Sequence, residues 1–340
     1  MEKYSKAYWI LAVSFIALFL GNLVYGTVSI PVGEVFSILL GGECQKASWS
    51  LIILNSRLPQ CITAMLSGAS LAISGLLLQT LFRNPLAGPS ILGISDGANL
   101  GVAIVMLCTG GVIGGMGMGG YLTIVLAALA GSMSVLAIII YFSRQVKSNV
   151  MLLIIGIMIG YLASSLISIL NYHASADKVH QFVMWGMGDF SGVSTEKLPY
   201  FACFTIIGLI YSLLLIKPLN ALLLGEMYAA NLGVNVKGAR ISILLCTGIL
   251  TAAITAFCGP VSFIGLAVPH VARMLLGTSN HRHLVPVTIL SGACIAMLCN
   301  MLTVVPGSNS MLPLNAVTPM IGAPIIIYVI VNRKNLQYFN

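Results

Sequence analysis

The chain has 340 residues, of which 58% are hydrophobic and only 7% are charged. Soluble domains carry roughly 25% charged residues, so this composition excludes a water-soluble fold and predicts a polytopic membrane protein. The formal net charge of +8 reflects loop residues on one side of the membrane and does not indicate nucleic-acid binding. The eight cysteines include no C-x-x-C pair, which predicts small core residues, not metal ligands or a disulfide framework.

A membrane-spanning helix needs about 20 apolar residues, and ten segments meet or approach that length. The first follows Lys3 and Lys6 and has no small-residue cleavage site, so we interpret it as a retained span and not as a signal peptide. The fold expected is a single all-α integral membrane domain over residues 1–340. Its predicted spans are residues 7–26, 58–82, 90–109, 121–142, 150–170, 198–216, 240–258, 261–277, 284–305 and 314–332.

Basic residues predict the orientation, because Lys and Arg are enriched in cytoplasmic loops. With the N-terminus inside, most of them fall at the inner ends of the spans: Lys3, Lys6, Arg83, Arg144, Lys147, Lys217, Lys237, Arg240, Arg273, Arg282, Arg333 and Lys334. The outer side receives only Lys46, Arg57, Lys178 and Lys197. Both termini are therefore expected in the cytoplasm of a bacterium, with the chain in its inner membrane. Residues 171–195 are expected to form a short half-helix at the outer mouth.

Two segments break the regular span pattern. Residues 82–101, FRNPLAGPSILGISDGANLG, contain Pro85 and Pro89, which forbid a continuous helix. Residues 259–276, GPVSFIGLAVPHVARMLL, contain Pro269 inside a predicted span. Irregular backbone at membrane depth is tolerated where it is buried in protein or lines an aqueous cavity. Each segment is therefore either a static kink or part of a transport pathway.

Single polar residues near these segments have competing interpretations. Asp96 either caps the third span by accepting from its free N–H groups or lines a pathway. His270, beside a proline, is expected to satisfy a freed carbonyl and not to bind a metal. His281 and His283 flank Arg282 in a predicted cytoplasmic loop, where nothing nearby completes a metal site. We expect no metal site and no cofactor in this chain.

Residues 219–240, LNALLLGEMYAANLGVNVKGAR, form the longest break in apolar character after residue 200. Pro218 is expected to end the preceding helix, and Gly225 and Gly233 to bracket about two turns of helix. Its apolar residues recur at helical spacing: Leu223, Met227, Ala230 and Val234. Such a helix either rests on the bilayer surface or docks to another protein. A single acid, Glu226, and no base in its core favour docking.

Eight strings between residues 50 and 332 resemble the permease subunits of FecCD-type ABC importers. They are R-L-P-Q at 57–60, G-A-S-L-A-I-S-G at 68–75, F-R-N-P-L-A at 82–87, L-G-I-S-D-G-A at 92–98, W-G-M-G at 185–188, L-G-E-M-Y-A-A-N-L-G at 224–233, F-I-G-L-A-V-P-H-V-A-R at 263–273 and L-P-L-N-A-V-T-P-M-I-G-A-P at 312–324. The family imports iron-siderophores, haem or cobalamin. The resemblance implies the type II importer architecture, with ten helices per subunit, some of them broken or re-entrant.

The resemblance also implies partners. A second copy of the chain would complete the pathway, two cytoplasmic ATPase subunits would dock on residues 219–238, and a substrate-binding protein would deliver cargo to the outer face. The chain has no G-x-x-x-x-G-K-[ST] string, so ATP and Mg are expected on the ATPases and the chain is not expected to be an enzyme. The coupling residues implied are Leu223, Gly225, Glu226, Met227, Ala230 and Gly233.

Further roles are implied by position in the family motifs. Asn84 and Leu86 match residues that narrow the inner end of the pathway. Asn149 and Val150 fall at a second inner constriction, where cobalamin-importing members carry small hydroxyl residues. Arg57 matches a basic residue that faces the binding protein, although the second basic position of R-L-P-R is Gln60 here.

Ferric siderophore is the default cargo because it dominates the family, with cobalamin and haem as alternatives. An ion-coupled secondary transporter would also explain broken helices. Such transporters usually hold a central ionisable residue, and none of the predicted spans has one that is clearly central. An intramembrane protease is disfavoured because neither G-x-S-G nor H-E-x-x-H occurs.

Overall fold

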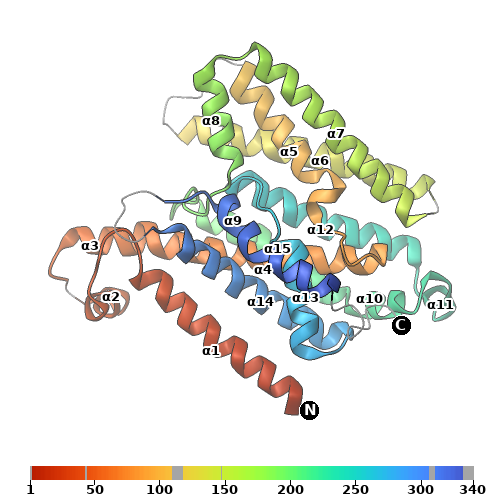
Figure 1. Cartoon of the computed structure of the whole chain (residues 1–340), viewed down its shortest axis with the longest axis horizontal. Helices are drawn as coiled ribbons and strands as arrows, with labels where there is room; N and C mark the ends of the chain where they lie inside the picture. The colour runs from red at the N-terminus through yellow and green to blue at the C-terminus, as the bar shows by residue number, and fades with distance from the viewer. Residues whose placement is uncertain (1, 43, 109–117, 147, 306–310, 332–340) are drawn as a thin grey trace.

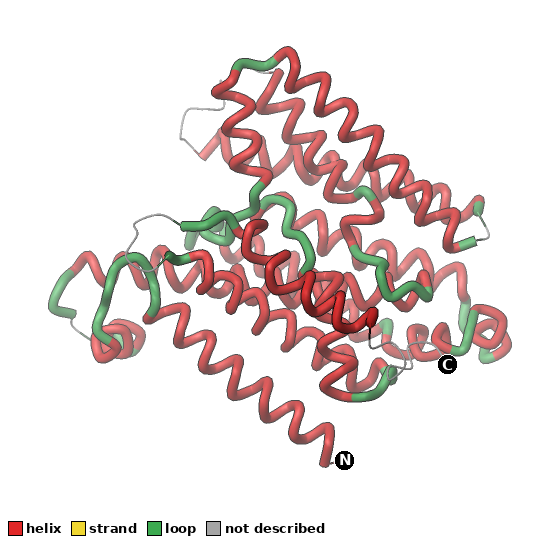
Figure 2. Tube along the Cα trace, viewed as in Figure 1, coloured by secondary structure: helices red, strands yellow, loops and turns green. Residues whose placement is uncertain are grey.

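The computed structural model describes residues 2–42, 44–108, 118–146, 148–305 and 311–331. Within these ranges the chain consists of helices joined by turns and loops, and it forms no β-strand beyond one isolated bridge between Val304 and Met311 (Figure 2). The all-helical prediction is confirmed for this part of the chain.

Long helices alternate with short ones, because prolines and glycines interrupt several apolar runs (Figure 1). In chain order the helices are α1 (Glu2–Val24), α2 (Val32–Leu39), α3 (Ala47–Ile52), η1 (Ile53–Arg57), α4 (Leu58–Phe82), η2 (Pro89–Leu92), α5 (Ile94–Ala103), η3 (Ile104–Cys108), α6 (Met118–Gln145), α7 (Asn149–His173), α8 (Ala176–Gly186), α9 (Leu198–Leu214), α10 (Ile216–Leu223), α11 (Glu226–Asn231), α12 (Val236–Cys258), α13 (Ile264–Leu276), α14 (His281–Thr303) and α15 (Leu314–Val331).

Six helices of the described residues are long and apolar enough to cross a membrane, or seven if α9 and α10, bent by 51°, count as one span. Three predicted spans correspond to shorter apolar helices, at Ile94–Cys108, Ile264–Leu276 and Leu314–Val329. The membrane class is confirmed, but the count of ten spans is not.

Helix α4 is the centre of the bundle. Nearly all of its 25 residues are buried, and it packs against α9, α12, α13 and α14. Small residues permit these close contacts: a Cβ at Gly68 would collide with the carbonyl oxygen of Gly292 in α14, and one at Gly75 with that of Gly265 in α13. Such packing of small residues is how helices associate in lipid.

A polar network also ties the central bundle together. The amide of Asn300 in α14 donates to Asn22 Oδ1 in α1 (2.7 Å) and accepts from Gln60 Nε2 in α4 (2.9 Å). All three side chains are buried. Buried amides in a membrane protein are stable when they are paired across helices in this way.

Helices α5 to α8 form a second layer beside the central bundle (Figure 1). Helix α5 packs on α6 and α7, and α12 bridges the layers by contacting both α6 and α4. The predicted half-helix at 171–195 is confirmed as α8.

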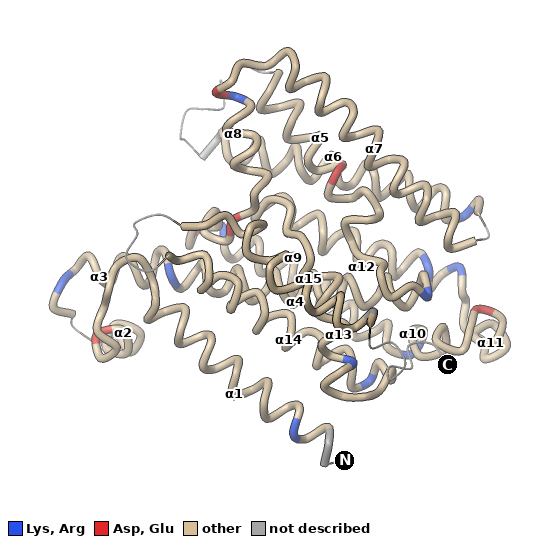
Figure 3. Tube along the Cα trace, viewed as in Figure 1, with Lys and Arg blue, Asp and Glu red and all other residues tan. Residues whose placement is uncertain are grey.

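The Lys and Arg residues gather at one end of the molecule, which holds α10, α11 and the N-terminal turn of α1 (Figure 3). We call it the basic end. The opposite end holds α2, α3 and α8 (Figure 1). This charge distribution agrees with the basic pattern from which a cytoplasmic side was predicted.

The breaks in the chain confirm one prediction and correct two. Between α4 and α5 the helix is interrupted from Arg83 to Gly88, as Pro85 and Pro89 predicted. Pro218, however, lies in the first turn of α10 and does not end a helix, because a proline there displaces no helical N–H bond. Helix α13 likewise runs through Pro269; its irregular segment precedes it, at residues 259–263.

Candidate functional site

The predicted helix between Gly225 and Gly233 is confirmed as α11, at the basic end. Both glycines have positive φ values, 105° and 83°, which residues with a Cβ rarely adopt. They turn the chain sharply out of α10 and then towards α12. The two glycines therefore set the limits of α11.

One face of α11 is apolar and exposed. Met227 is 81% exposed, Tyr228 65%, and Leu232 just beyond the helix 65%. Of the predicted stripe, Met227 and Ala230 lie on the surface, whereas Leu223 and Val234 are half-buried. This surface lies outside the candidate spans.

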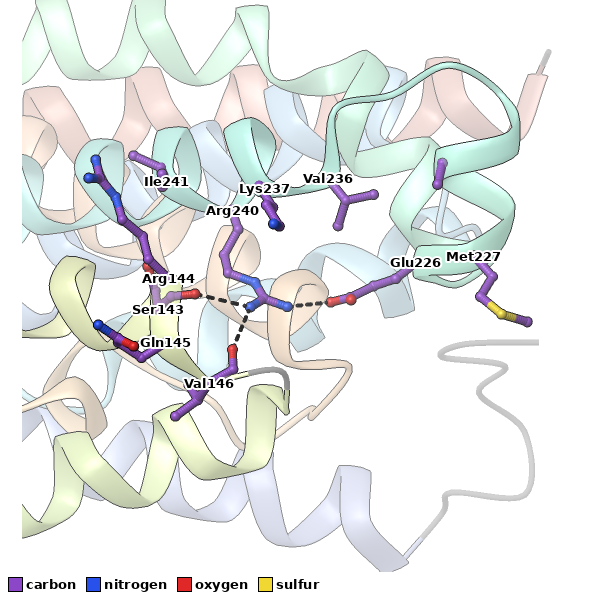
Figure 4. Close-up of a pocket in the computed structure, with 11 residues that line it drawn as sticks. Ser143, Arg144, Gln145, Val146, Glu226, Met227, Val236, Lys237, Arg240 and Ile241 are labelled. Carbon is purple, nitrogen blue, oxygen red and sulfur yellow. Dashed lines mark hydrogen bonds and ion pairs between the residues drawn. The ribbon is translucent and has the colours of Figure 1, made fainter.

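The other face of α11 is tied to the bundle through Glu226. Its Oε1 accepts from Nη2 of Arg240 at 2.9 Å and from Nδ2 of Asn149 at 2.9 Å. In the part of the chain that the structure describes, Glu226–Arg240 is the one ion pair between side chains (Figure 4). Glu226, the single acid of the predicted docking helix, is thus paired within the chain while its side chain stays 39% exposed; its role in docking remains a prediction.

Arg240 and Asn149 extend this contact to the ends of two further helices, α6 and α4. Arg240 Nη1 donates to the carbonyls of Ser143 at 3.4 Å and Val146 at 3.3 Å, where α6 ends (Figure 4). Asn149 Nδ2 also donates to the carbonyl of Leu81 in the last turn of α4, at 3.0 Å. The ends of α4, α6 and α7 and the start of α12 thus meet at one carboxylate.

A cavity of about 750 Å³ lies beside this contact, between α11, α12 and the end of α6. Its walls are mostly aliphatic, and Arg144, Lys237 and Arg240 give it a positive rim (Figure 4). Met227 and Ala230 of α11 form part of its border. The cavity therefore continues the exposed face of α11 into the body of the chain.

The predicted gate turn at Asn84 and Leu86 is held rigidly. Asn84 Oδ1 accepts from the backbone N–H of Leu86 at 2.9 Å. Nε2 of His270, in α13, donates to the carbonyl of Pro85 at 2.8 Å. His270 thus satisfies a carbonyl, as predicted, although the carbonyl belongs to this turn and not to its own helix. Leu86 itself is 42% exposed.

The structure brings the two predicted constrictions together at the end of α4. Asn149 binds the carbonyl of Leu81, three residues before Asn84. Val150 follows Asn149 at the start of α7 and is 62% exposed. The predicted gate residues and the predicted coupling residues therefore form one connected region.

Arg57 is not the exposed anchor that its motif implied. Its residue is only 7% exposed. Its guanidinium donates to the carbonyls of Leu23 and Val24 at 2.8 Å each, and also to that of Val28. The π-helical turn η1 directs it towards α1 instead of towards solvent.

Two further expectations are corrected. Asp96 lies in the first turn of α5, whose N-cap is Gly93, so it is not the cap; its carboxylate packs against α7, where a Cβ at Gly160 would lie 2.6 Å from Oδ2. His281 is not in an exposed loop. It begins α14, is fully buried, and contacts Thr80 Oγ1 at 2.9 Å.

Two asparagines were missed as organising residues. Asn220 Oδ1 accepts from the N–H of His281 at 2.8 Å and joins α10 to α14. Asn315 accepts from the N–H of Ser262 at 3.0 Å and donates to the carbonyl of Pro260 at 2.6 Å, so it holds the irregular segment before α13. Asn315 lies inside the L-P-L-N-A-V-T-P string, which was the available signal.

Comparison with known proteins agrees with this architecture. A family model described as the FecCD transport family matches residues 14–332. The vitamin B12 import system permease protein BtuC of Klebsiella pneumoniae subsp. pneumoniae is 33% identical over 307 residues, covering 90% of each chain. The protein of the same name from Salmonella paratyphi A is 33% identical over 326 residues, covering 95% of this chain and 94% of that one.

A solved structure is similar over nearly the whole chain. It is described as an inward-facing conformation of a metal-chelate type ABC transporter. The TM-score is 0.83 at 30% identity, and the match covers 97% of this chain and 99% of that chain. The motif resemblance is thus confirmed by sequence and by fold, and the chain belongs to the FecCD transport family of ABC importer permeases.

Proposed function

We propose that this chain is the membrane permease of an ATP-driven importer that moves a metal chelate from a binding protein into the cytoplasm. Two copies form the pathway, and two ATPase subunits dock at the basic end. The observation that carries the proposal is the exposed apolar face of α11, joined by Glu226 to Asn149 and to the end of α4. ATP hydrolysis on a separate ATPase subunit can move the helices of this chain only through a contact between the two proteins, such as one at α11.

The docking test replaces Met227 with Asp. Met227 is 81% exposed in the isolated chain, so the new charge costs little until a partner covers it. In the complex an unpaired buried ion is strongly unfavourable. We expect normal membrane insertion but loss of ATPase co-purification and of uptake.

The matched control is Asn231→Asp, which adds the same charge to the same helix at an exposed position off the apolar stripe. It should retain the ATPases. Normal uptake and ATPase binding by Met227→Asp would show that α11 is not the docking contact.

The cargo proposed first is a corrinoid, because relatives 33% identical over 90% or more of the chain are named vitamin B12 permeases. Ferric siderophore is the second candidate. It is favoured by Asn149 and Val150, which replace the small hydroxyl residues of cobalamin-importing members. Both cargoes are bulky metal chelates, as the name of the similar solved structure suggests.

Uptake distinguishes the cargoes. Cells that lack this chain are complemented with it and given labelled cobalamin, a labelled ferric siderophore or labelled haem in turn. We expect restored uptake of one metal chelate, and none with the Met227→Asp variant. If none of the three is taken up while the ATPases remain bound, these three cargoes are excluded for this chain.

A further inference from the structure

We infer that Glu226 is the link through which a displacement of α11 reaches the basic ends of α4, α6 and α7, and that it is a positioning residue, not a contact with the ATPase. The inference rests on the proposed function, because the displacement is supplied by the docked ATPases. It assigns the two faces of α11 to different tasks. Met227 and Tyr228 are exposed for docking, and the carboxylate of Glu226, whose side chain is 39% exposed, bonds to the bundle.

Helix α11 is too short to hold its own position. A helix of six residues is marginal in isolation, so its placement depends on its contacts with the rest of the chain. Asn220 fixes the preceding helix α10 to α14. Beyond Gly225, the side chain of Glu226 makes the connection to α7 and α12. Helix α11 is also held by Ala229, which is fully buried in the core. A force applied to the exposed face of α11 therefore reaches α7 and α12 through this carboxylate as well as through packing.

One oxygen of Glu226 serves both partners. Hydrogen bonds to an ionised group are roughly twice as strong as neutral ones, and Arg240, whose side chain is 9% exposed, is well shielded from water. Arg240 donates to the carbonyls of Ser143 in the last turn of α6 and of Val146 just after it, and Asn149 donates to the carbonyl of Leu81 in α4. Glu226 moves only if these contacts break or if the three helix ends move with it.

The path from this contact to the gate is short. Leu81 lies one residue before the end of α4, and the turn with Asn84 and Leu86 follows directly. Among the described residues, the buried Oδ1 of Asn149 and Nε of Arg240 have no hydrogen-bond partner. The network is thus only partly satisfied, and these atoms are available to a second arrangement, which a coupling element requires.

The test is Glu226→Ala, with Asn231→Ala as the matched control on the same helix. Three quantities are measured: ATPase subunits that co-purify, ATP hydrolysis in proteoliposomes, and cargo transported per ATP hydrolysed. We expect the ATPases to stay bound and transport per ATP to fall about 2- to 30-fold, the range of residues that carry coupling. Because it is normalised to bound, active ATPase, this ratio is not lowered by poor expression.

Two further variants keep the inference testable. Glu226→Gln nearly preserves the shape of the side chain and still accepts from Asn149. We therefore expect a fall in transport per ATP that is smaller than that of Glu226→Ala. Asn149→Ala should not add to Glu226→Ala, because both break the same link.

If Glu226→Gln fails to retain the ATPases, Glu226 is a docking residue. If Glu226→Ala leaves transport per ATP unchanged, Glu226 does not couple α11 to the helix ends. Either result overturns this inference while leaving the proposed function to its own tests, Met227→Asp and uptake.

Discussion

At the scale of single residues, Arg57 acts as a helix cap. Helix α1 ends at Val24, so the carbonyls of Leu23 and Val24 have no partner within the helix. The guanidinium of Arg57 supplies donors to both, and to Val28 in the following loop. A buried cation is tolerated when it is hydrogen-bonded, as Arg57 is to these three carbonyls. Its role is therefore to fix the loop between α1 and α2.

This role predicts the effect of Arg57→Ala. Three carbonyls lose a charged donor, and we expect a destabilisation of about 3 kcal/mol, seen as a lower midpoint of thermal unfolding in detergent. Lys46→Ala is the control, because Lys46 is exposed and only lies over the ring of Trp49, at 5.1 Å. An unchanged midpoint for Arg57→Ala, with weaker binding-protein affinity, would restore the docking role that the motif implied.

At the scale of elements, the turn between α4 and η2 is the predicted inner gate. Its backbone is fixed by Asn84, by His270 and by Arg83, which adopts the left-handed conformation at the end of α4. Leu86 contributes bulk without taking part in these hydrogen bonds through its side chain. Truncation to Ala should therefore open the constriction without moving the turn.

Leu86→Ala should let cargo leak through proteoliposomes without ATP while the complex stays assembled. The measurement is passive efflux of preloaded labelled cargo. Leu122→Ala, on α6 and also exposed at 56%, is the control for removing an apolar surface side chain. Tight vesicles with Leu86→Ala would place the gate elsewhere, with Asn149 and Val150 as the next residues to change.

Local signals in the sequence predicted these elements well. Two predictions rest on backbone preferences that act within a few residues. They are the limits of α11 at Gly225 and Gly233, and the helix break at Pro85 and Pro89. Pro218 was misinterpreted because a proline is equally compatible with the end of one helix and the first turn of the next. Helix boundaries therefore depend on tertiary context even where proline and glycine clearly mark a break.

Long-range pairing was not predictable. The bond from Asn149 to Glu226 joins residues 77 positions apart, and hydrophobic periodicity does not report such pairs. The motif implied that Arg57 is exposed to the binding protein. Its side chain instead donates to carbonyls about 30 residues earlier in the chain. Three predicted spans correspond to shorter apolar helices within the described residues, because composition alone does not fix the bounds of a helix.

At the scale of the whole molecule, the predicted gate residues lie on the surface of the chain. Leu86 is 42% exposed and Val150 is 62% exposed, whereas the interior of the bundle is filled by α4 and its neighbours. A constriction on the outside of one chain closes a pathway only when another chain faces it. The pathway is therefore expected between two copies, related by the two-fold symmetry that is commonest among oligomers.

This geometry predicts a homodimer of permeases with two ATPases, measured by native mass spectrometry of the purified complex. It also predicts that Val150→Cys cross-links to its symmetry mate, in a chain whose exposed Cys108 and Cys203 are first replaced by Ser. Leu122→Cys, exposed on α6, should not cross-link. If the complex holds one permease for each ATPase pair, the exposed gate residues must meet a different protein or lipid. A pathway between copies is then impossible, because Leu86 and Val150 would have no second wall to close against.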